Sequence, residues 1–186
     1  MRWINPPPFY SFDGEGVLAL KTGDKTDFWQ STFYGFHRDD GHVFARPLDG
    51  AFTMAVDFDG DYEELYDQAG LIVRASATSW IKCGVELTDG MKHLSVVVTN
   101  GKSDWSAIPI ETTGPVGIRM TRLRDAFFIQ FRLAPDAAWR MARLAYLNSE
   151  NERLEGGVMA CSPKRAGFEA RFSAFSITPA VITDIH

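Results

Sequence analysis

Several features that would assign a function at once are absent from this 186-residue sequence. It has only two cysteines, Cys83 and Cys161, and no CxxC pair or cluster of histidine and cysteine that would indicate zinc. No phosphate-binding loop, dinucleotide fingerprint or nucleophile elbow occurs. The sequence therefore predicts no cofactor site. Because two strands can bring distant cysteines together, pairing of Cys83 with Cys161 stays open.

Positive charge and long apolar runs are also scarce. The chain has 19 basic and 24 acidic side chains, for a net charge of -5, and its densest basic stretch is 119–124. It therefore lacks the basic surface of a general nucleic-acid binder. No apolar run approaches the ~20 residues needed to cross a bilayer, and the segment 1–8 lacks the apolar core of a signal peptide. We expect no nucleic-acid partner, no membrane partner and a cytoplasmic location.

Apolar and aromatic residues are abundant, at 45% and 13%, which suits one globular domain over residues 1–186 with a sizeable core. The dominant pattern alternates with a period of two, which is typical of strands. Asp-Gly and Asn-Gly turns separate many of the alternating runs. These runs are 17–21, 42–46, 51–58, 68–75, 80–87, 94–99, 116–122, 127–133, 157–161 and 168–177.

Many short strands joined by such turns predict an all-β sandwich or barrel. The segment 137–147 has a composition that also fits a helix. Its residues Trp139, Met141 and Arg143 nevertheless alternate with their neighbours, so we interpret the segment as a strand. We find no repeat and no linker, in agreement with a single domain.

Seven short words in chain order carry a resemblance to a known family. They are Asp27-Phe28-Trp29, Tyr34-Gly35-Phe36, Asp40-Gly41-His42, Tyr66-Asp67-Gln68-Ala69-Gly70-Leu71, Trp80-Ile81-Lys82-Cys83-Gly84-Val85-Glu86, Ser103-Asp104-Trp105-Ser106 and Cys161-Ser162-Pro163. Together they resemble the DUF1349 family, also called the regulation of enolase protein family, over nearly the whole chain. The resemblance implies a concanavalin A-like jelly-roll sandwich of two antiparallel sheets. It is similar to the C-terminal sandwich of some β-xylosidases, and lectins and glucanases share the broad fold. A fold of this kind does not fix a function.

Strand parity divides the side chains between two faces of a sheet. We assign Leu71, Val73, Ile81, Val85, Val96 and Val98 to the core, together with Phe52, Phe127, Phe131 and Phe172. The opposite face then carries Gln68, Arg74, Trp80, Lys82, Glu86, Ser95 and Thr99, while Arg119, Gln130 and Arg132 fall on the polar sides of their strands. In a concanavalin-like sandwich, the outer side of one curved sheet is a concave groove.

A face that mixes aromatic and polar side chains suits a saccharide, because aromatic rings stack on sugar C–H faces and polar groups bind hydroxyls. The alternative is an ordinary solvated sheet face with ion pairs. Loop aromatics beside turns are further candidates, although each is also explained by packing. The predicted ligand-binding residues are Trp29, His42, Tyr66, Gln68, Arg74, Trp80, Lys82, Glu86, Thr99, Asp104, Trp105 and Arg119.

Glu86 is the candidate acid or base, with Lys82 and Asp67 as further catalytic candidates. Lys82 and Glu86 share a strand face roughly 13 Å apart along the backbone. No carboxylate lies two residues from Glu86, and the Glu-x-Asp-x-x-Glu strand of concanavalin-like glucanases is missing. The leading hypothesis is therefore a carbohydrate- or small-ligand-binding module. A saccharide-acting enzyme and a protein-interaction module that modulates a metabolic enzyme are the alternatives.

The segment 57–61 places Asp57, Asp59 and Asp61 at alternate positions, and calcium takes oxygen ligands. It lacks the residue order of an EF-hand loop, and a strand end followed by an Asp-Gly turn explains it equally. We predict no metal site and leave calcium at this segment open.

Overall fold

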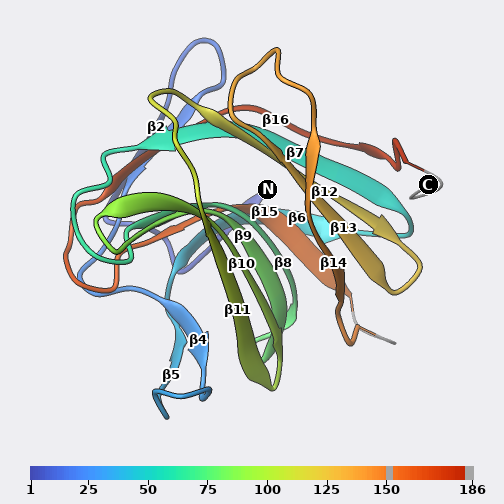
Figure 1. Ribbon diagram of the computed structural model, residues 1–186, viewed down its shortest axis with the longest axis horizontal. Helices are drawn as coiled ribbons and strands as arrows, with labels where there is room; N and C mark the ends of the chain where they lie inside the picture. The colour runs from blue at the N-terminus through green and yellow to red at the C-terminus, as the bar shows by residue number, and fades with distance from the viewer. Residues whose placement is uncertain (150–152, 183–186) are drawn as a thin grey trace.

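Two seven-stranded antiparallel sheets pack face to face in the computed structural model, which describes residues 1–149 and 153–182 (Figure 1). Sheet A runs in the order β1 (Arg2–Ile4), β6 (His42–Leu48), β15 (Leu154–Cys161), β8 (Gln68–Ser76), β9 (Ser79–Thr88), β10 (Met91–Asn100), β11 (Lys102–Pro109). Sheet B runs in the order β14 (Arg140–Tyr146), β13 (Ala126–Arg132), β12 (Val116–Leu123), β7 (Phe52–Gly60), β16 (Glu169–Pro179), β3 (Leu18–Lys21), β2 (Phe9–Phe12). The predicted all-β jelly-roll sandwich is confirmed.

A small hairpin of β4 (Phe28–Gln30) and β5 (His37–Asp39) stands apart from the two sheets and lies on the outer side of sheet A (Figure 1). No helix long and apolar enough to cross a membrane occurs in the described ranges.

The main core lies between the sheets and follows the predicted parity. Leu71, Val73 and Ile81 of sheet A are fully buried there against side chains from sheet B. All four phenylalanines assigned to packing, Phe52, Phe127, Phe131 and Phe172, belong to this core. Full burial of one such side chain stabilises the fold by roughly 1.5–3 kcal/mol.

A second apolar cluster covers the other face of sheet A. Phe28 and Trp29 of the hairpin pack there over Trp80, with ring centroids of Phe28 and Trp80 5.9 Å apart. The rest of this outer cluster is Val43, Ala45, Ile72, Val97, Met159 and Cys161. Sheet A is therefore buried on both faces over much of its centre, and parity alone did not show that the hairpin covers part of its outer face.

Five strands have no clear period-two signal in the sequence: β1, β2, β4, β5 and β11. Four of them have only three or four residues, and β11 is an edge strand whose side chains are mostly exposed. The ambiguous segment 137–147 does form a strand, β14, paired with β13. Tertiary pairing on the sheet edge outweighs the helix-forming composition of that segment.

The structure shows where the two cysteines and the three aspartates of segment 57–61 lie. Cys83 and Cys161 are both free thiols, and they lie in the two clusters on opposite faces of sheet A. Asp57 is bound by Arg132, whereas an Asp61 oxygen accepts from the Glu169 backbone N–H at 2.6 Å. Within residues 1–149 and 153–182, no group of three or more His, Cys, Asp or Glu side chains could hold a metal ion.

Two glycines let the centre of sheet A pack closely. Gly70 of β8 faces Gly84 of β9, and a Cβ on Gly84 would lie 1.9 Å from the carbonyl oxygen of Ala69. Ser95 of β10 is the next partner of Gly84 in the same row. This row of small residues leaves space on the outer face between the longer side chains on either side of it.

We expect Gly84→Ala to lower the free energy of unfolding by about 1–3 kcal/mol, because the added methyl group must displace backbone atoms. Urea unfolding measures this change. Gly14→Ala is the matched control, since nothing lies within 4 Å of a Cβ at that position. Equal stability of the two variants would contradict the close approach of β8 and β9.

Candidate functional site

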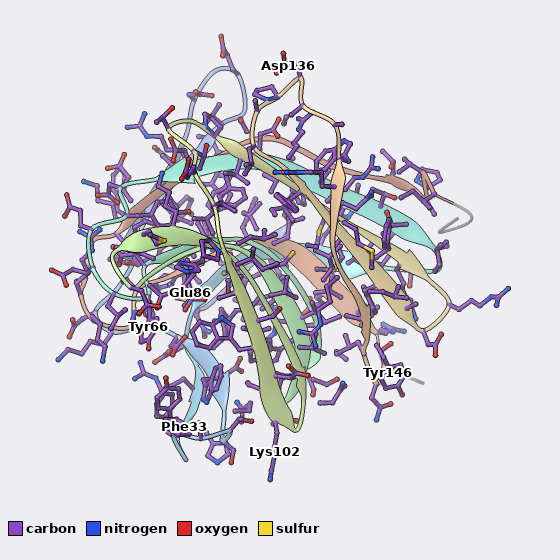
Figure 2. The ribbon with its side chains drawn as sticks, in the orientation of Figure 1. Phe33, Tyr66, Glu86, Lys102, Asp136 and Tyr146 are labelled. Atoms are coloured by element: carbon purple, nitrogen blue, oxygen red, sulfur yellow. The ribbon has the colours of Figure 1, made fainter. Side chains whose placement is uncertain are left out.

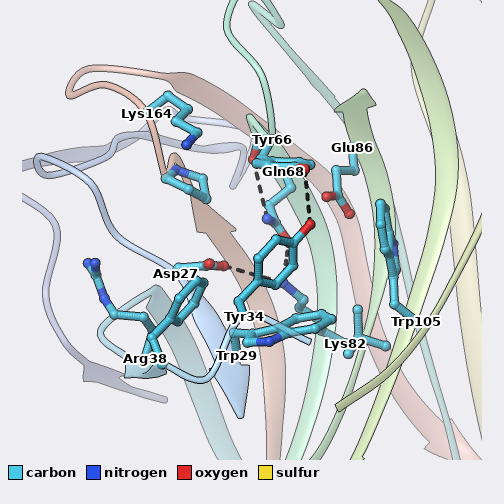
Figure 3. Close-up of a pocket in the computed structure, with 13 residues that line it drawn as sticks. Asp27, Trp29, Tyr34, Arg38, Tyr66, Gln68, Lys82, Glu86, Trp105 and Lys164 are labelled. Atoms are coloured by element: carbon cyan, nitrogen blue, oxygen red, sulfur yellow. Dashed lines mark hydrogen bonds and ion pairs between the residues drawn. The ribbon is translucent and has the colours of Figure 1, made fainter. Parts of the chain in front are cut away.

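A cavity of about 390 Å³ opens on the outer face of sheet A, beside the β4–β5 hairpin (Figure 3). Its volume falls in the range of small-molecule sites. Thirteen residues line it: Asp27, Trp29, Tyr34, Phe36, Arg38, Tyr66, Gln68, Lys82, Glu86, Val97, Trp105, Pro163 and Lys164.

Lys82 of β9 forms the centre of the cavity floor. Its side chain is only 4% exposed, and its Nζ donates to Gln68 Oε1 at 2.5 Å and lies 3.7 Å from Asp27 Oδ1. Burial alone lowers the pKa of this ammonium, but the nearby charges, Asp27 first among the carboxylates, outweigh burial and raise the pKa. Lys82 is therefore a fixed positive charge at the bottom of the cavity.

Glu86 lies four residues further along β9, on the same face as Lys82, with Gly84 between them on that face. Its Oε2 accepts a hydrogen bond from Ser95 Oγ at 2.6 Å, and Ser95 Oγ accepts in turn from Trp105 Nε1 at 3.0 Å. Burial raises the pKa of Glu86, and the positive charge of Lys82 only partly offsets that effect. The relay through Ser95 fixes both the carboxyl group and the indole at the cavity wall.

Aromatic rings form the walls (Figure 3). On the hairpin side, Tyr34 meets Trp29 edge-on and stacks on Phe36, each pair with ring centroids 5.6 Å apart. On the opposite side, Tyr66 and Trp105 meet edge-on at 6.4 Å. The cavity is thus a polar floor between two aromatic walls.

Tyr66 bridges these walls at the mouth of the cavity. Its hydroxyl lies 3.4 Å from that of Tyr34, and this contact, more than burial, raises the pKa of Tyr66 to about 12. The backbone of Tyr66 has a φ of 70°. A non-glycine residue in this left-handed region costs of order 1–3 kcal/mol and is often found at functional sites.

The structure brings half of the predicted ligand-binding residues together. Six of the twelve line the cavity: Trp29, Tyr66, Gln68, Lys82, Glu86 and Trp105. The other six do not: His42, Arg74, Trp80, Thr99, Asp104 and Arg119.

Four of the residues outside the cavity are internal and already bonded. The His42 ring accepts from the Gly23 N–H and donates to the Asn5 carbonyl, and burial lowers its pKa. Arg74 pairs with Asp39 of the hairpin. Trp80 and Thr99 have no exposed surface, so parity placed them on the outer face correctly but could not show that the hairpin covers them.

The remaining candidates belong to other surfaces. Asp104 is exposed and pairs with Arg143. Arg119 lies on β12 of sheet B, so it does not share a sheet with Glu86. Asp67, the suggested catalytic partner of Glu86, is fully buried and is bound by Arg165 and by backbone N–H groups outside the cavity.

Sequence parity missed seven lining residues: Asp27, Tyr34, Phe36, Arg38, Val97, Pro163 and Lys164. Most come from loops or the hairpin, where no strand period points to one face. A signal for four of them was present, because Asp27, Tyr34, Phe36 and Pro163 stand in the words that carry the family resemblance.

The fold and this cavity define a concanavalin A-like β-sandwich with a ligand-sized hollow on the outer face of one sheet. A family model covers residues 3–180, and the chain belongs to that family, DUF1349, which is described as a protein of unknown function.

One relative matches almost the whole chain. Regulation of enolase protein 1 of Saccharomyces cerevisiae is 40% identical over 185 residues, which cover 99% of this chain and 92% of the relative. The crystal structure of a functionally unknown protein from Saccharomyces cerevisiae superposes with a TM-score of 0.91, at 38% identity and with 97% of each chain covered.

More distant structures share the fold alone. GH43B of a Bacteroides ovatus xyloglucan PUL gives a TM-score of 0.74 at 19% identity, with 95% of this chain and 36% of that chain covered. The carbohydrate binding module CBM66 of Bacillus subtilis gives a TM-score of 0.56 at 13% identity, with 94% of each chain covered.

The raised pKa of Glu86 predicts a pH-dependent effect of Glu86→Gln on stability. The folded chain binds the Glu86 proton more tightly than the unfolded chain. The contribution of this group to the free energy of unfolding is therefore fully present below its ordinary pKa of 4.5. It is lost as the pH rises through the folded pKa. We expect the variant to gain in unfolding free energy relative to the native chain as the pH rises above 4.5.

Urea unfolding of both proteins at several pH values measures this difference. A constant difference across that range would show that burial does not perturb Glu86. Glu15→Gln serves as the control, because Glu15 is exposed and lies in a surface turn.

Proposed function

We propose that the protein binds a saccharide, or a comparable hydroxyl-rich small ligand, in the cavity on sheet A. The observation that carries the proposal is the arrangement of aromatic walls over a charged, hydrogen-bonding floor. Aromatic faces stack on the C–H faces of a sugar ring, and the floor supplies groups that bind its hydroxyls.

The floor offers both a donor and an acceptor to a ligand. An ammonium carries three donors, and Lys82 directs one at Gln68 Oε1 and faces Asp27 Oδ1 at 3.7 Å, which leaves one for a ligand. The Glu86 carboxyl group uses Oε2 on Ser95, which leaves Oε1 for another partner. A hydroxyl both donates and accepts, so a ligand with neighbouring hydroxyls suits this pair better than a purely apolar molecule.

The comparisons support the same reading at the level of fold. CBM66 is a carbohydrate binding module by its name, and it shares the sandwich over most of both chains. Because one fold serves many functions, the proposal rests on the cavity and not on that likeness.

A saccharide-acting enzyme is the second candidate, favoured by the buried Glu86 beside Lys82. Asp27 is the other carboxylate that lines the cavity. With Glu86 as acid or base, Glu86→Gln should lower the turnover of any identified substrate by about 10²–10⁴. Unchanged turnover in that variant would exclude this role.

An interaction with a metabolic enzyme is the third candidate, favoured by the name of the yeast relative and by an exposed aromatic at the hairpin tip. Phe33 is 93% exposed, and Tyr34 beside it is half-exposed. Figure 2 labels Phe33 at the outer end of the hairpin.

We also propose a cytoplasmic location. Both cysteines are free thiols, as is usual for proteins in a reducing compartment.

Isothermal titration calorimetry against a panel of neutral and acidic mono- and oligosaccharides tests the binding function. We expect one class of saccharide in the panel to bind. Trp105→Ala should lower the affinity for that saccharide at least tenfold, about 1.4 kcal/mol, because the variant removes an aromatic ring on which the sugar stacks.

Tyr146→Ala is the matched control. Tyr146 is 50% exposed on β14 of the other sheet, so its loss should leave the affinity unchanged. Absence of binding across the panel by a folded protein would overturn the proposal, as would equal affinities for the native protein and Trp105→Ala.

A further inference from the structure

The outer face of sheet B carries a cluster of two arginines around one tryptophan, far from the cavity. Arg119 lies on β12, Arg132 ends β13, and Trp139 precedes β14. Asp136, in the loop between β13 and β14, and Phe33 of the hairpin are at opposite ends of the view in Figure 2. We call Arg119, Arg132 and Trp139 the arginine–tryptophan cluster.

Both guanidinium groups lie against the same indole. The carbon of each is 4.7 Å from the centre of the Trp139 ring, within the distance of a cation–π contact. Arg119 Nε donates to Gln130 Oε1 at 2.6 Å, which holds the base of its side chain to the neighbouring strand. The two cations are therefore positioned by the fold and not left to move freely in solvent.

A glycine allows one of these side chains to lie over the sheet. A Cβ on Gly117 would come within 2.6 Å of both Cγ and Nε of Arg132, so any larger residue would displace the arginine. Arg132 in turn donates through Nη2 to Asp57 at 2.7 and 2.8 Å, and through Nη1 to the Pro135 carbonyl.

The charges in the cluster do not balance. Asp57 neutralises Arg132, but among the described residues no carboxylate pairs with Arg119, and Asp136 in the adjacent loop forms no ion pair with either arginine. Burial and the positive charge of Arg132 lower the pKa of Arg119. One positive charge is thus held near another of the same sign without a counter-charge from the described chain.

Hydrogen-bond donors are also left over. Both terminal nitrogens of Arg119 have no acceptor among the described residues, and Arg132 Nε is buried with no partner. The two terminal nitrogens of Arg119 are therefore the donors that a ligand could use. An anion would meet the excess charge and the spare donors together.

We propose that the arginine–tryptophan cluster is a binding site for an oxyanion, namely a phosphate monoester or a carboxylate. The planar guanidinium fork matches the oxygens of both groups, which a single ammonium would not do as well. The site is separate from the cavity on sheet A and does not depend on the function proposed for that cavity.

Titration of ¹⁵N-labelled protein with inorganic phosphate, followed by NMR, tests this site. We expect the indole N–H signal of Trp139, assigned with Trp139→Phe, and the Nε–H signal of Arg119 to shift to saturation. Acetate provides the carboxylate arm and distinguishes the two ligand groups. Sodium chloride at equal ionic strength provides the reference for salt effects.

Arg119→Gln should weaken phosphate or acetate binding at least tenfold, and Arg119→Lys, which keeps the charge but loses the fork, should also weaken it. Arg171→Gln is the control, because Arg171 is an exposed arginine of sheet B that pairs with Glu169. Shifts that match those in chloride, or that persist unchanged in Arg119→Gln, would overturn the proposal. If Arg119→Gln does not fold, the comparison of native protein with Arg119→Lys and with chloride decides the outcome.

Discussion

The buried ammonium of Lys82 links the two parts of the structure that make the cavity. It donates to Gln68 of sheet A and lies close to Asp27, at the start of the hairpin. Asp27 also accepts a hydrogen bond from the Phe28 N–H, which sets the direction of β4. A buried charge without a partner is costly, so Lys82 of the sheet is stabilised by Asp27 at the start of the hairpin. The same ion pair holds the start of the hairpin to the sheet. The cavity is the space left between them.

Much of the fold was predictable because β-structure has a simple period. Parity placed Gln68, Lys82 and Glu86 on one face, and the register of β8 and β9, which pairs Gln68 with Glu86, brings them together. Parity cannot tell which sheet a strand joins, so it cannot show that Arg119 lies on the opposite sheet from Glu86. It also cannot show what covers a face. Trp80 is on the predicted side, but Phe28 lies over it.

The cavity owes its shape to small residues as well as to the large ones that line it. Gly70, Gly84 and Ser95 form a row across sheet A between the rows of Glu86 and Lys82. Three of the aromatic wall residues, Trp29, Tyr34 and Phe36, come from the hairpin, and Tyr66 comes from a loop, whereas Trp105 lies on the edge strand β11. This division explains why a shared sandwich fold says little about the ligand. The sheet supplies the floor, and the hairpin, one loop and the edge strand β11 supply the aromatic walls.

We propose that a hydroxyl-rich ligand occupies the cavity above Lys82 and Glu86. A crystal of the protein soaked in a concentrated mixture of saccharides tests this proposal. We expect electron density for a sugar ring between Trp29 and Trp105, with hydroxyls within hydrogen-bond distance of Lys82 Nζ and Glu86. An empty cavity, or sugar bound only elsewhere on the surface, would contradict it.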